Sequence, residues 1–133
     1  MAGPRVMVID DDPDVGESIG DLLALGGYRA VIVESGQAAL ELVAHGSFQL
    51  VLLDWHLAEE PAGFELVRRL RALDRELPLV VLSADPISLE EAHSAGITGC
   101  LGKPFDYQTL LAVARAHVRP PSSPASDQPG ENT

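Results

Sequence analysis

The stretch VMVIDDDPDV, residues 6–15, places four apolar residues directly before Asp10, Asp11 and Asp12, and Pro13 follows. An uninterrupted apolar run of this kind is typical of a strand that is covered on both faces of a sheet. Carboxylates held close together raise one another's pKa values unless a positive group lies among them. The stretch therefore predicts a buried strand that ends at a site where a cation is needed.

Four further apolar runs follow and alternate with helical patterns. The predicted strands are Arg5–Asp10, Ala30–Glu34, Leu50–Asp54, Leu79–Ser83 and Gly99–Leu101. Asp12 and Ser35 are expected as N-caps of the first two helices, and Ser88 with Glu91 fits a capping box for a short fourth helix ending near Gly96. Strands and helices in strict alternation predict an α/β protein, with a five-stranded parallel sheet between two layers of helices.

Polar residues gather where the predicted strands end. Strand ends supply Asp10, Asp11, Asp54 and Ser83, and Lys103, the only lysine in the chain, follows the fifth strand. Ligands of parallel sheets bind beyond the carboxyl ends of the strands, so these side chains are expected to meet. Three carboxylates and one ammonium leave negative charge in excess, which favours Mg²⁺. A carboxylate beside Mg²⁺ and an ammonium can act as a nucleophile toward phosphorus.

The amino-acid composition disfavours several classes of partner and location. The formal net charge is −11, from 20 acidic and 9 basic residues, which disfavours direct binding to nucleic acid or to an anionic membrane. The one basic cluster, Arg68, Arg69, Arg71 and Arg75, is expected on the solvated side of a helix. Cys100 is the only cysteine, so an internal disulfide is excluded. No apolar run approaches the roughly 20 residues that cross a bilayer, and a cytoplasmic location is expected.

These motifs resemble the receiver domains of two-component response regulators, over residues 5 to about 118. The resemblance rests on VMVIDDDPDV at 6–15, ESGQAALEL at 34–42, LVLLD at 50–54, VVLSA at 80–84 and GKPF at 102–105. It implies a flavodoxin-like (βα)5 fold, a doubly wound sheet with strand order 2-1-3-4-5. Residues 1–119 are expected to form this domain. The proline- and serine-rich segment 120–133 is expected to be a disordered tail without an output domain.

The resemblance also implies a role for each residue of the acidic site. Asp54 would accept a phosphoryl group from a histidine of a sensor kinase or phosphotransfer protein. Asp11, Asp54 and the backbone carbonyl of His56 would ligate Mg²⁺, and Asp10 would hold the ion through water. The His56 side chain would also lie over the phosphorylation pocket. It is expected there as an exposed neutral histidine; the alternative hypothesis is that it tunes how fast water reaches the acyl phosphate.

Two further residues would contact the phosphoryl group. Ser83 would swing onto it and Lys103 would pair with it, and the bond between Lys103 and Pro104 is commonly cis in this family. The resemblance implies a phosphoacceptor and not an enzyme, apart from self-phosphorylation by small phosphodonors and slow self-dephosphorylation. Its signal would pass to an unknown downstream protein.

The chain departs from the family pattern at two places. Cys100 stands where the family usually has a Tyr or Phe that changes rotamer on phosphorylation, and it is expected to be a small buried side chain in the strand. This switch would act on the face formed by the fourth helix, the strand Gly99–Leu101 and the fifth helix, which is also a possible homodimer surface. The loop after Asp54 has Ala58 at the usual proline position, and its own Pro61 and Gly63 are displaced.

Three alternatives remain open from the sequence. The departures are compatible with a pseudo-receiver that binds proteins without being phosphorylated. Asp10 and Asp12 fit the D-x-D spacing of haloacid-dehalogenase-type phosphatases, although the chain is short for such an enzyme. A flavodoxin-like carrier is the weakest alternative, because the turn after the first strand is acidic where a flavin phosphate needs amide and hydroxyl donors.

Overall fold

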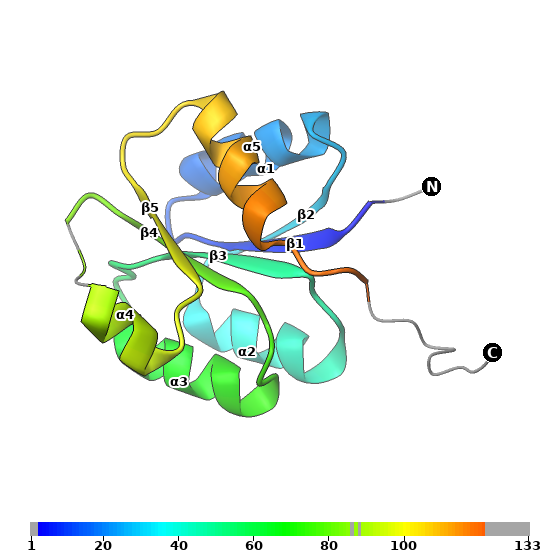
Figure 1. Ribbon diagram of the computed structural model, residues 1–133. Helices are drawn as coiled ribbons and strands as arrows, with labels where there is room; N and C mark the ends of the chain where they lie inside the picture. The colour runs from blue at the N-terminus through cyan, green and yellow to red at the C-terminus, as the bar shows by residue number, and fades with distance from the viewer. Residues whose placement is uncertain (1–2, 86, 88, 122–133) are drawn as a thin grey trace.

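The computed structural model describes residues 3–85, 87 and 89–121, which form a parallel sheet with helices on both faces (Figure 1). The strands are β1 (Arg5–Ile9), β2 (Arg29–Val33), β3 (Leu50–Asp54), β4 (Leu79–Ser83) and β5 (Gly99–Gly102). The helices are α1 (Pro13–Leu25), α2 (Gly36–His45), α3 (Gly63–Leu73), α4 (Leu89–Ala95) and α5 (Tyr107–His117). Every predicted strand is confirmed, and no boundary differs by more than one residue.

The strand order is β2-β1-β3-β4-β5 and all four pairings are parallel, as the resemblance implied. Figure 1 shows α1 and α5 on one face of the sheet and α2, α3 and α4 on the other. Since β1 pairs with both β2 and β3, the order in which strands are added to the sheet reverses there, and Ile9 lies opposite Leu53. This register brings the residues after β1 next to the end of β3.

Two hydrophobic cores hold the helix layers against the sheet. Alternate residues of the strands face opposite cores, so that Met7 and Val51 pack toward α2 and α3 whereas Val8 and Leu52 pack toward α1 and α5. The side chains of all four are fully buried. The uninterrupted apolar runs were therefore correctly interpreted as strands covered on both faces.

The helix starts follow the predicted capping chemistry where the structure describes them. Asp12 accepts a hydrogen bond from the amide of Asp14 at 3.0 Å, and Ser35 Oγ accepts one from the amide of Ala38 at 3.1 Å. These caps satisfy amide groups that have no partner inside the helix. The predicted cap Ser88 lies outside the described residues, as does segment 122–133 of the predicted tail.

The arginine cluster on and after α3 is only partly solvated. Arg68, Arg69 and Arg75 are exposed, as predicted. Arg71 is half-buried instead, and its guanidinium donates to the carbonyl of Gly96 at 2.6 Å and to the carbonyl of Arg75 at 2.9 Å. The expectation for Arg71 was wrong because these backbone carbonyls, one of them distant in sequence, give its donors partners inside the fold.

Candidate functional site

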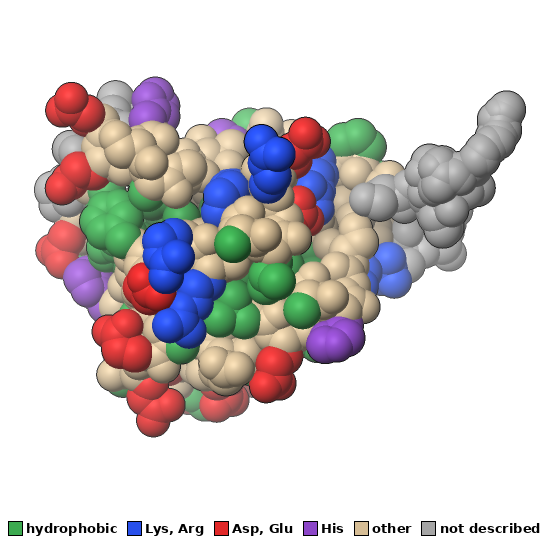
Figure 2. Space-filling view, turned by 90° about the horizontal axis from the view of Figure 1, so that it is seen from below, with side chains coloured by type: hydrophobic (Ala, Val, Ile, Leu, Met, Phe, Trp, Pro, Cys, Tyr) green, Lys and Arg blue, Asp and Glu red, His purple; other side chains and the backbone are tan. Residues whose placement is uncertain are grey.

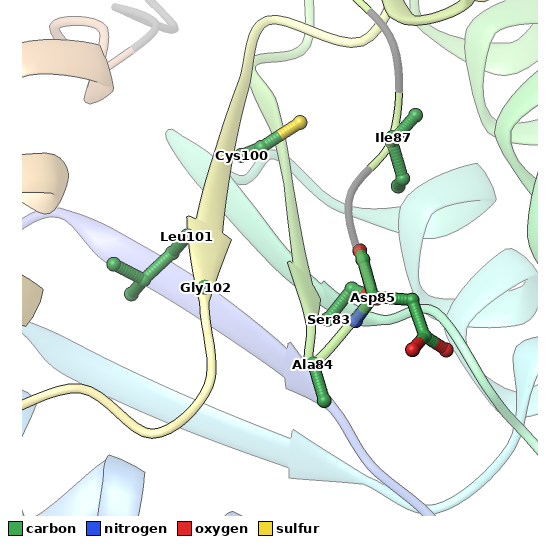
Figure 3. Close-up of a pocket in the computed structure, with 7 residues that line it drawn as sticks. All are labelled: Ser83, Ala84, Asp85, Ile87, Cys100, Leu101 and Gly102. Atoms are coloured by element: carbon green, nitrogen blue, oxygen red, sulfur yellow. The ribbon is translucent and has the colours of Figure 1, made fainter.

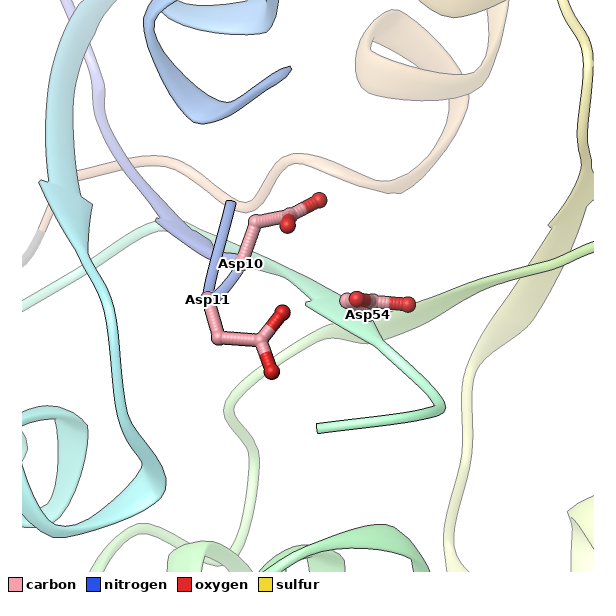
Figure 4. A group of neighbouring side chains, drawn as sticks. All are labelled: Asp10, Asp11 and Asp54. Atoms are coloured by element: carbon pink, nitrogen blue, oxygen red, sulfur yellow. The ribbon is translucent and has the colours of Figure 1, made fainter. Parts of the chain in front are cut away.

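The predicted acidic residues meet at the carboxyl edge of the sheet (Figure 4). Asp10 and Asp11 directly follow β1, and Asp54 is the last residue of β3. One carboxylate oxygen of each lies within 4.8 Å of the others. The parallel pairing of β1 and β3 causes this convergence, because it aligns the ends of the two strands.

Asp10 is the most buried of the three, with only 2% of its surface exposed. Burial raises the pKa of this carboxyl, the neighbouring carboxylates of Asp54 and Asp11 add to the rise, and the amide of Asp12 and the Lys103 ammonium oppose it. Its Oδ1 accepts the Asp12 amide at 2.9 Å. Its Oδ2 is buried and has no hydrogen-bond partner among the described residues. A buried carboxylate oxygen without a donor is costly, so this atom is poised for a cation.

Lys103 supplies the positive charge that the sequence predicted. Its Nζ donates to Oδ1 of Asp54 at 3.4 Å and lies 3.8 Å from Oδ2 of Asp10. The backbone amide of Lys103 donates to the carbonyl of Ser83 at 2.9 Å, which fixes the start of the loop after β5 beside β4. The bond between Lys103 and Pro104 is cis, as the resemblance implied.

The donor set fits Mg²⁺. Three carboxylates face one ammonium, so the described part of the site keeps an excess of negative charge, and the oxygens are the hard ligands that Mg²⁺ prefers. The unpartnered Oδ2 of Asp10 is an independent indication, because a cation or its bound water would satisfy it. Asp10, Asp11 and Asp54 could therefore hold the ion. The carbonyl of His56 as a further ligand stays a prediction.

The altered loop after Asp54 is tied directly to the acidic site. The amide of Ala58 donates to Oδ2 of Asp11 at 2.7 Å. The bond between Glu60 and Pro61 is cis, and the Pro61 carbonyl lies 2.2 Å from where a Cβ on Gly36 would be. The displaced proline therefore packs the loop against the start of α2, and Ala58 keeps its amide on Asp11.

Ser83 lies at the edge of the site with its hydroxyl engaged elsewhere. Its Oγ donates to the carbonyl of Asp85 at 2.9 Å and accepts from the amide of Asp85 at 3.0 Å. The hydroxyl has a single proton, so contact with a phosphoryl group would require Ser83 to leave this arrangement. Its role as a phosphoryl ligand stays a prediction.

The structure also shows a contact between two site loops that the sequence did not predict. Nε2 of His56 lies 3.1 Å from Oδ2 of Asp85, and the two side chains are 59% and 75% exposed. The His56 side chain thus lies toward the loop after β4, and its backbone amide donates to Oδ1 of Asp54 at 3.3 Å. No local pattern could signal this pair, because the two residues lie on different loops.

The prediction that Cys100 is buried was wrong, because this residue is exposed. Figure 3 shows its side chain projecting from β5 toward the loop that carries Ile87, away from Leu101. It lines an open cavity of about 340 Å³ together with Ser83 and Asp85. β5 is the edge strand of the sheet, and Cys100 lies on the face of this strand that borders the cavity. Partial burial raises the pKa of the Cys100 thiol, which disfavours the thiolate form.

The sequence of this chain is similar to those of response regulators, which agrees with the composition of the acidic site. Residues 6–115 match the family model of the response regulator receiver domain. The response regulator MprA of Mycobacterium sp. (strain KMS) is 38% identical over 117 residues, which are 86% of this chain and 50% of that protein. MprA of Mycobacterium leprae is 37% identical, with 86% and 51% covered. The chain thus spans about half the length of these relatives.

Solved structures show the same fold. The chemotaxis protein CheY4 of Vibrio cholerae superimposes with a TM-score of 0.79 at 25% identity, over 88% of this chain and all of that one. The receiver domain of the sensor histidine kinase PA1611 of Pseudomonas aeruginosa, described with a magnesium ion coordinated in its active site cleft, gives 0.78 at 25% identity, over 87% and 98%. In the described part of this chain, no helix is both long and apolar enough to span a bilayer. The chain belongs to the response regulator receiver domains of two-component systems.

Proposed function

We propose that Asp54 is a Mg²⁺-dependent phosphoacceptor that takes its phosphoryl group from a histidine of a sensor kinase or phosphotransfer protein. The observation that carries this proposal is the cluster of three carboxylates, two of them beside the Lys103 ammonium, with Oδ2 of Asp10 buried and without a hydrogen-bond partner among the described residues. The similarity to a magnesium-binding receiver domain supports the choice of metal.

The two oxygens of Asp54 differ in their surroundings. Oδ1 accepts from Lys103 Nζ and from the amide of His56, whereas no donor to Oδ2 is recorded among the described residues. We assign Oδ2 as the nucleophile for this reason. It forms a bond to phosphorus as the phosphorus–nitrogen bond of phosphohistidine breaks, and the electron pair of that bond returns to the imidazole.

Residues of this chain would then hold the transferred group. Mg²⁺, bound by Asp10, Asp11 and Asp54, would supply positive charge that offsets the charge of the phosphoryl oxygens. The Lys103 ammonium is within reach of Asp54 and would pair with another phosphoryl oxygen. Ser83 would exchange its bond to the Asp85 carbonyl for one to the phosphoryl group, which links phosphorylation to the loop after β4.

A groove beside Lys103 suits the histidine-bearing partner. It has a volume of about 600 Å³ and runs between α1 and the loop after β5, with Val15, Ile19, Leu22 and Phe105 in its lining. A partner helix packed on this apolar surface would bring its phosphohistidine toward the carboxyl edge of the sheet. The downstream protein and a homodimer through α4, β5 and α5 stay predictions.

The alternatives fit the site less well. A phosphatase with Asp10 as nucleophile would use a carboxyl that is 2% exposed and whose raised pKa disfavours the ionised form. A pseudo-receiver would not need the full acidic set and Lys103 that are present here. We therefore assign the chain as a phosphoacceptor switch and not as a turnover enzyme.

Intact mass spectrometry tests the proposal. Wild type and Asp54→Asn are each incubated with acetyl phosphate, either with Mg²⁺ or with EDTA. Asp12→Asn serves as a control, because it removes a neighbouring exposed charge and asparagine remains a good helix cap. We expect wild type and Asp12→Asn to gain one phosphoryl group, and only when Mg²⁺ is present. Asp54→Asn should gain none. No gain, while a control receiver is phosphorylated, would favour the pseudo-receiver.

A further inference from the structure

A shallow groove of about 400 Å³ runs between α2 and α3, on the sides of these helices that face away from the sheet (Figure 2). Its apolar lining is contributed by Leu40 and Ala44 of α2 and by Ala72 and Leu73, at the α3 end. Leu73 is 48% exposed, so much of its side chain is available for contact with a partner. Figure 2 shows this apolar strip with blue side chains along one side.

The rim of the groove on α3 carries more positive charge than its own partners neutralise. Arg68 and Arg69 both bind the single carboxylate of Glu65, at 2.6 and 2.7 Å. Arg69 uses only its Nε in this contact, so its two terminal nitrogens have no recorded acceptor within the described ranges. The side chains of Arg68 and Arg69 remain 69% and 48% exposed.

The opposite rim, on α2, differs in charge. It carries Glu41, Gln37 and His45, so the arginines line the groove along one side only. The molecule as a whole has a formal charge of −11, and four of its nine basic residues lie on or just after α3. A ligand that matches the groove therefore needs apolar groups for the floor and carboxylates along one flank.

We propose that this groove docks an amphipathic helix of a partner protein, with leucine-sized side chains between α2 and α3 and carboxylates opposite Arg68 and Arg69. A helix packs its side-chain ridges into the groove between two others, and an apolar stripe with one charged flank gives it orientation as well as affinity. Arginine guanidinium groups with free terminal nitrogens bind carboxylates in a bidentate manner.

The docking surface is separate from the phosphorylation site. None of the residues that line the groove lies at the carboxyl edge of the sheet where Asp10, Asp54 and Lys103 meet. The inference therefore goes beyond the proposed function, and it stands or falls independently of whether Asp54 is phosphorylated.

Two synthetic helical peptides provide the probe. Each has about 14 residues, or about 21 Å as a helix, with a leucine stripe; one carries glutamates on one flank and the other carries lysines there. Binding to the full ¹⁵N-labelled chain is followed by chemical-shift perturbation. We expect the glutamate peptide to bind about five- to tenfold more tightly than the lysine peptide at low salt, with shifts confined to α2 and α3.

Substitutions locate the contact. Leu73→Ser should weaken binding about tenfold, as expected for a leucine buried on binding, whereas Leu25→Ser, at a leucine that is 76% exposed on α1, should not change it. Arg69→Glu should abolish the preference for the glutamate peptide, and the matched charge reversal Arg75→Glu should preserve it. Circular dichroism checks that each variant is folded.

Four results would overturn the inference. The first is equal binding of the two peptides, and the second is a set of shifts centred on α1 and Phe105. The third is concentration-dependent dimerisation of wild type that Leu73→Ser removes, because the occupant would then be a second copy of this chain. The fourth is binding to phosphatidylglycerol vesicles that Arg69→Glu removes, because the groove would then face a lipid surface.

Discussion

Lys103 Nζ lies 3.4 Å from Oδ1 of Asp54 and the Lys103 side chain is only 30% exposed, so this ammonium lies inside the acidic site and not at its rim. It occupies the space between two buried carboxylates, since Asp10 Oδ2 is 3.8 Å away on its other side. In the absence of metal it is the main source of positive charge for the described acidic cluster. This arrangement makes Lys103 both a stabilising partner and a competitor of any cation that binds there.

Lys103→Met should separate these two effects. Without Mg²⁺ the substitution should lower the free energy of unfolding by about 1–3 kcal/mol, because it leaves buried carboxylates uncompensated. It should also raise the affinity for Mg²⁺ about three- to tenfold, because a competing positive charge is removed. Urea denaturation in EDTA measures the first effect. Mg²⁺ titration followed by the fluorescence of Trp55, the only tryptophan, measures the second. Weaker Mg²⁺ binding would contradict this description of the site.

Asp10→Asn should weaken Mg²⁺ binding and raise the stability of the metal-free protein. The pKa of Asp10 is raised, chiefly by burial, so its ionised form costs stability at neutral pH and this cost is relieved as pH falls through the raised value. In EDTA at pH 7 the variant should therefore unfold at a higher temperature than wild type. Mg²⁺ at about 100 times its Kd should stabilise wild type by about 2.7 kcal/mol and the variant by much less.

Asp12→Asn is the matched control for that experiment, because it removes an exposed charge close by and keeps the helix cap. It should respond to Mg²⁺ as wild type does. An Asp10→Asn variant that gained as much stability from Mg²⁺ as wild type would exclude Asp10 from the metal site.

Asp74→Asn should show how much the ion pair between Asp74 and Arg119, which follows α5, contributes to stability. Arg119 donates to both carboxylate oxygens of Asp74, at 3.2 and 2.6 Å, and this bonding lowers the pKa of Asp74. A lowered carboxyl pKa contributes stability above the unfolded-state value, about 3.9, and loses it as pH falls through the lower folded-state value. The variant should be less stable than wild type by about 1–2 kcal/mol at pH 7, and the difference should shrink below about pH 4. A difference that is independent of pH would mean that the charge of Asp74 is not responsible.

Gly36→Ala should disturb the displaced loop after Asp54. A Cβ at this position would lie 2.2 Å from the carbonyl oxygen of Pro61, which is too close for any side chain. We expect a loss of about 1–3 kcal/mol in the free energy of unfolding and weaker Mg²⁺ binding, because the loop carries the Ala58 amide that donates to Asp11. Gly46→Ala serves as a comparison, since Gly46 has an extended backbone with a φ of −154° and the nearest atom recorded for its Cβ position lies at 3.4 Å, an ordinary contact distance. A Gly36→Ala variant as stable as wild type would show that the loop can move away.

The sequence was sufficient to predict the strands and the composition of the acidic site. Uninterrupted apolar runs bounded by polar residues mark strands that are buried on both faces, and parallel pairing then aligns their ends without further information. The convergence of Asp10, Asp11 and Asp54 on Lys103 followed from this rule together with the resemblance, and the structure brings all four together.

Other features depended on contacts between distant segments. The exposure of Cys100 goes with the open cavity beside β5, which a four-residue strand does not reveal by its own pattern. Arg71 is held by the carbonyl of Gly96, and His56 by Asp85, each a partner on a different element. The spacing of Leu73 and Leu77 is also typical of one buried helix face, but α3 ends at Leu73, which is half exposed, whereas Leu77 is buried in the connection to β4.

Borohydride reduction of the phosphorylated protein tests the central claim most directly. An aspartyl phosphate is reduced to homoserine, and peptide mass spectrometry then identifies the residue that carried the phosphoryl group. After incubation with acetyl phosphate and Mg²⁺, we predict homoserine at position 54 and unmodified aspartate at positions 10, 11 and 12. Homoserine at position 10 would instead identify the nucleophile of a phosphatase-like site, and would contradict the assignment of Asp54 as the phosphoacceptor.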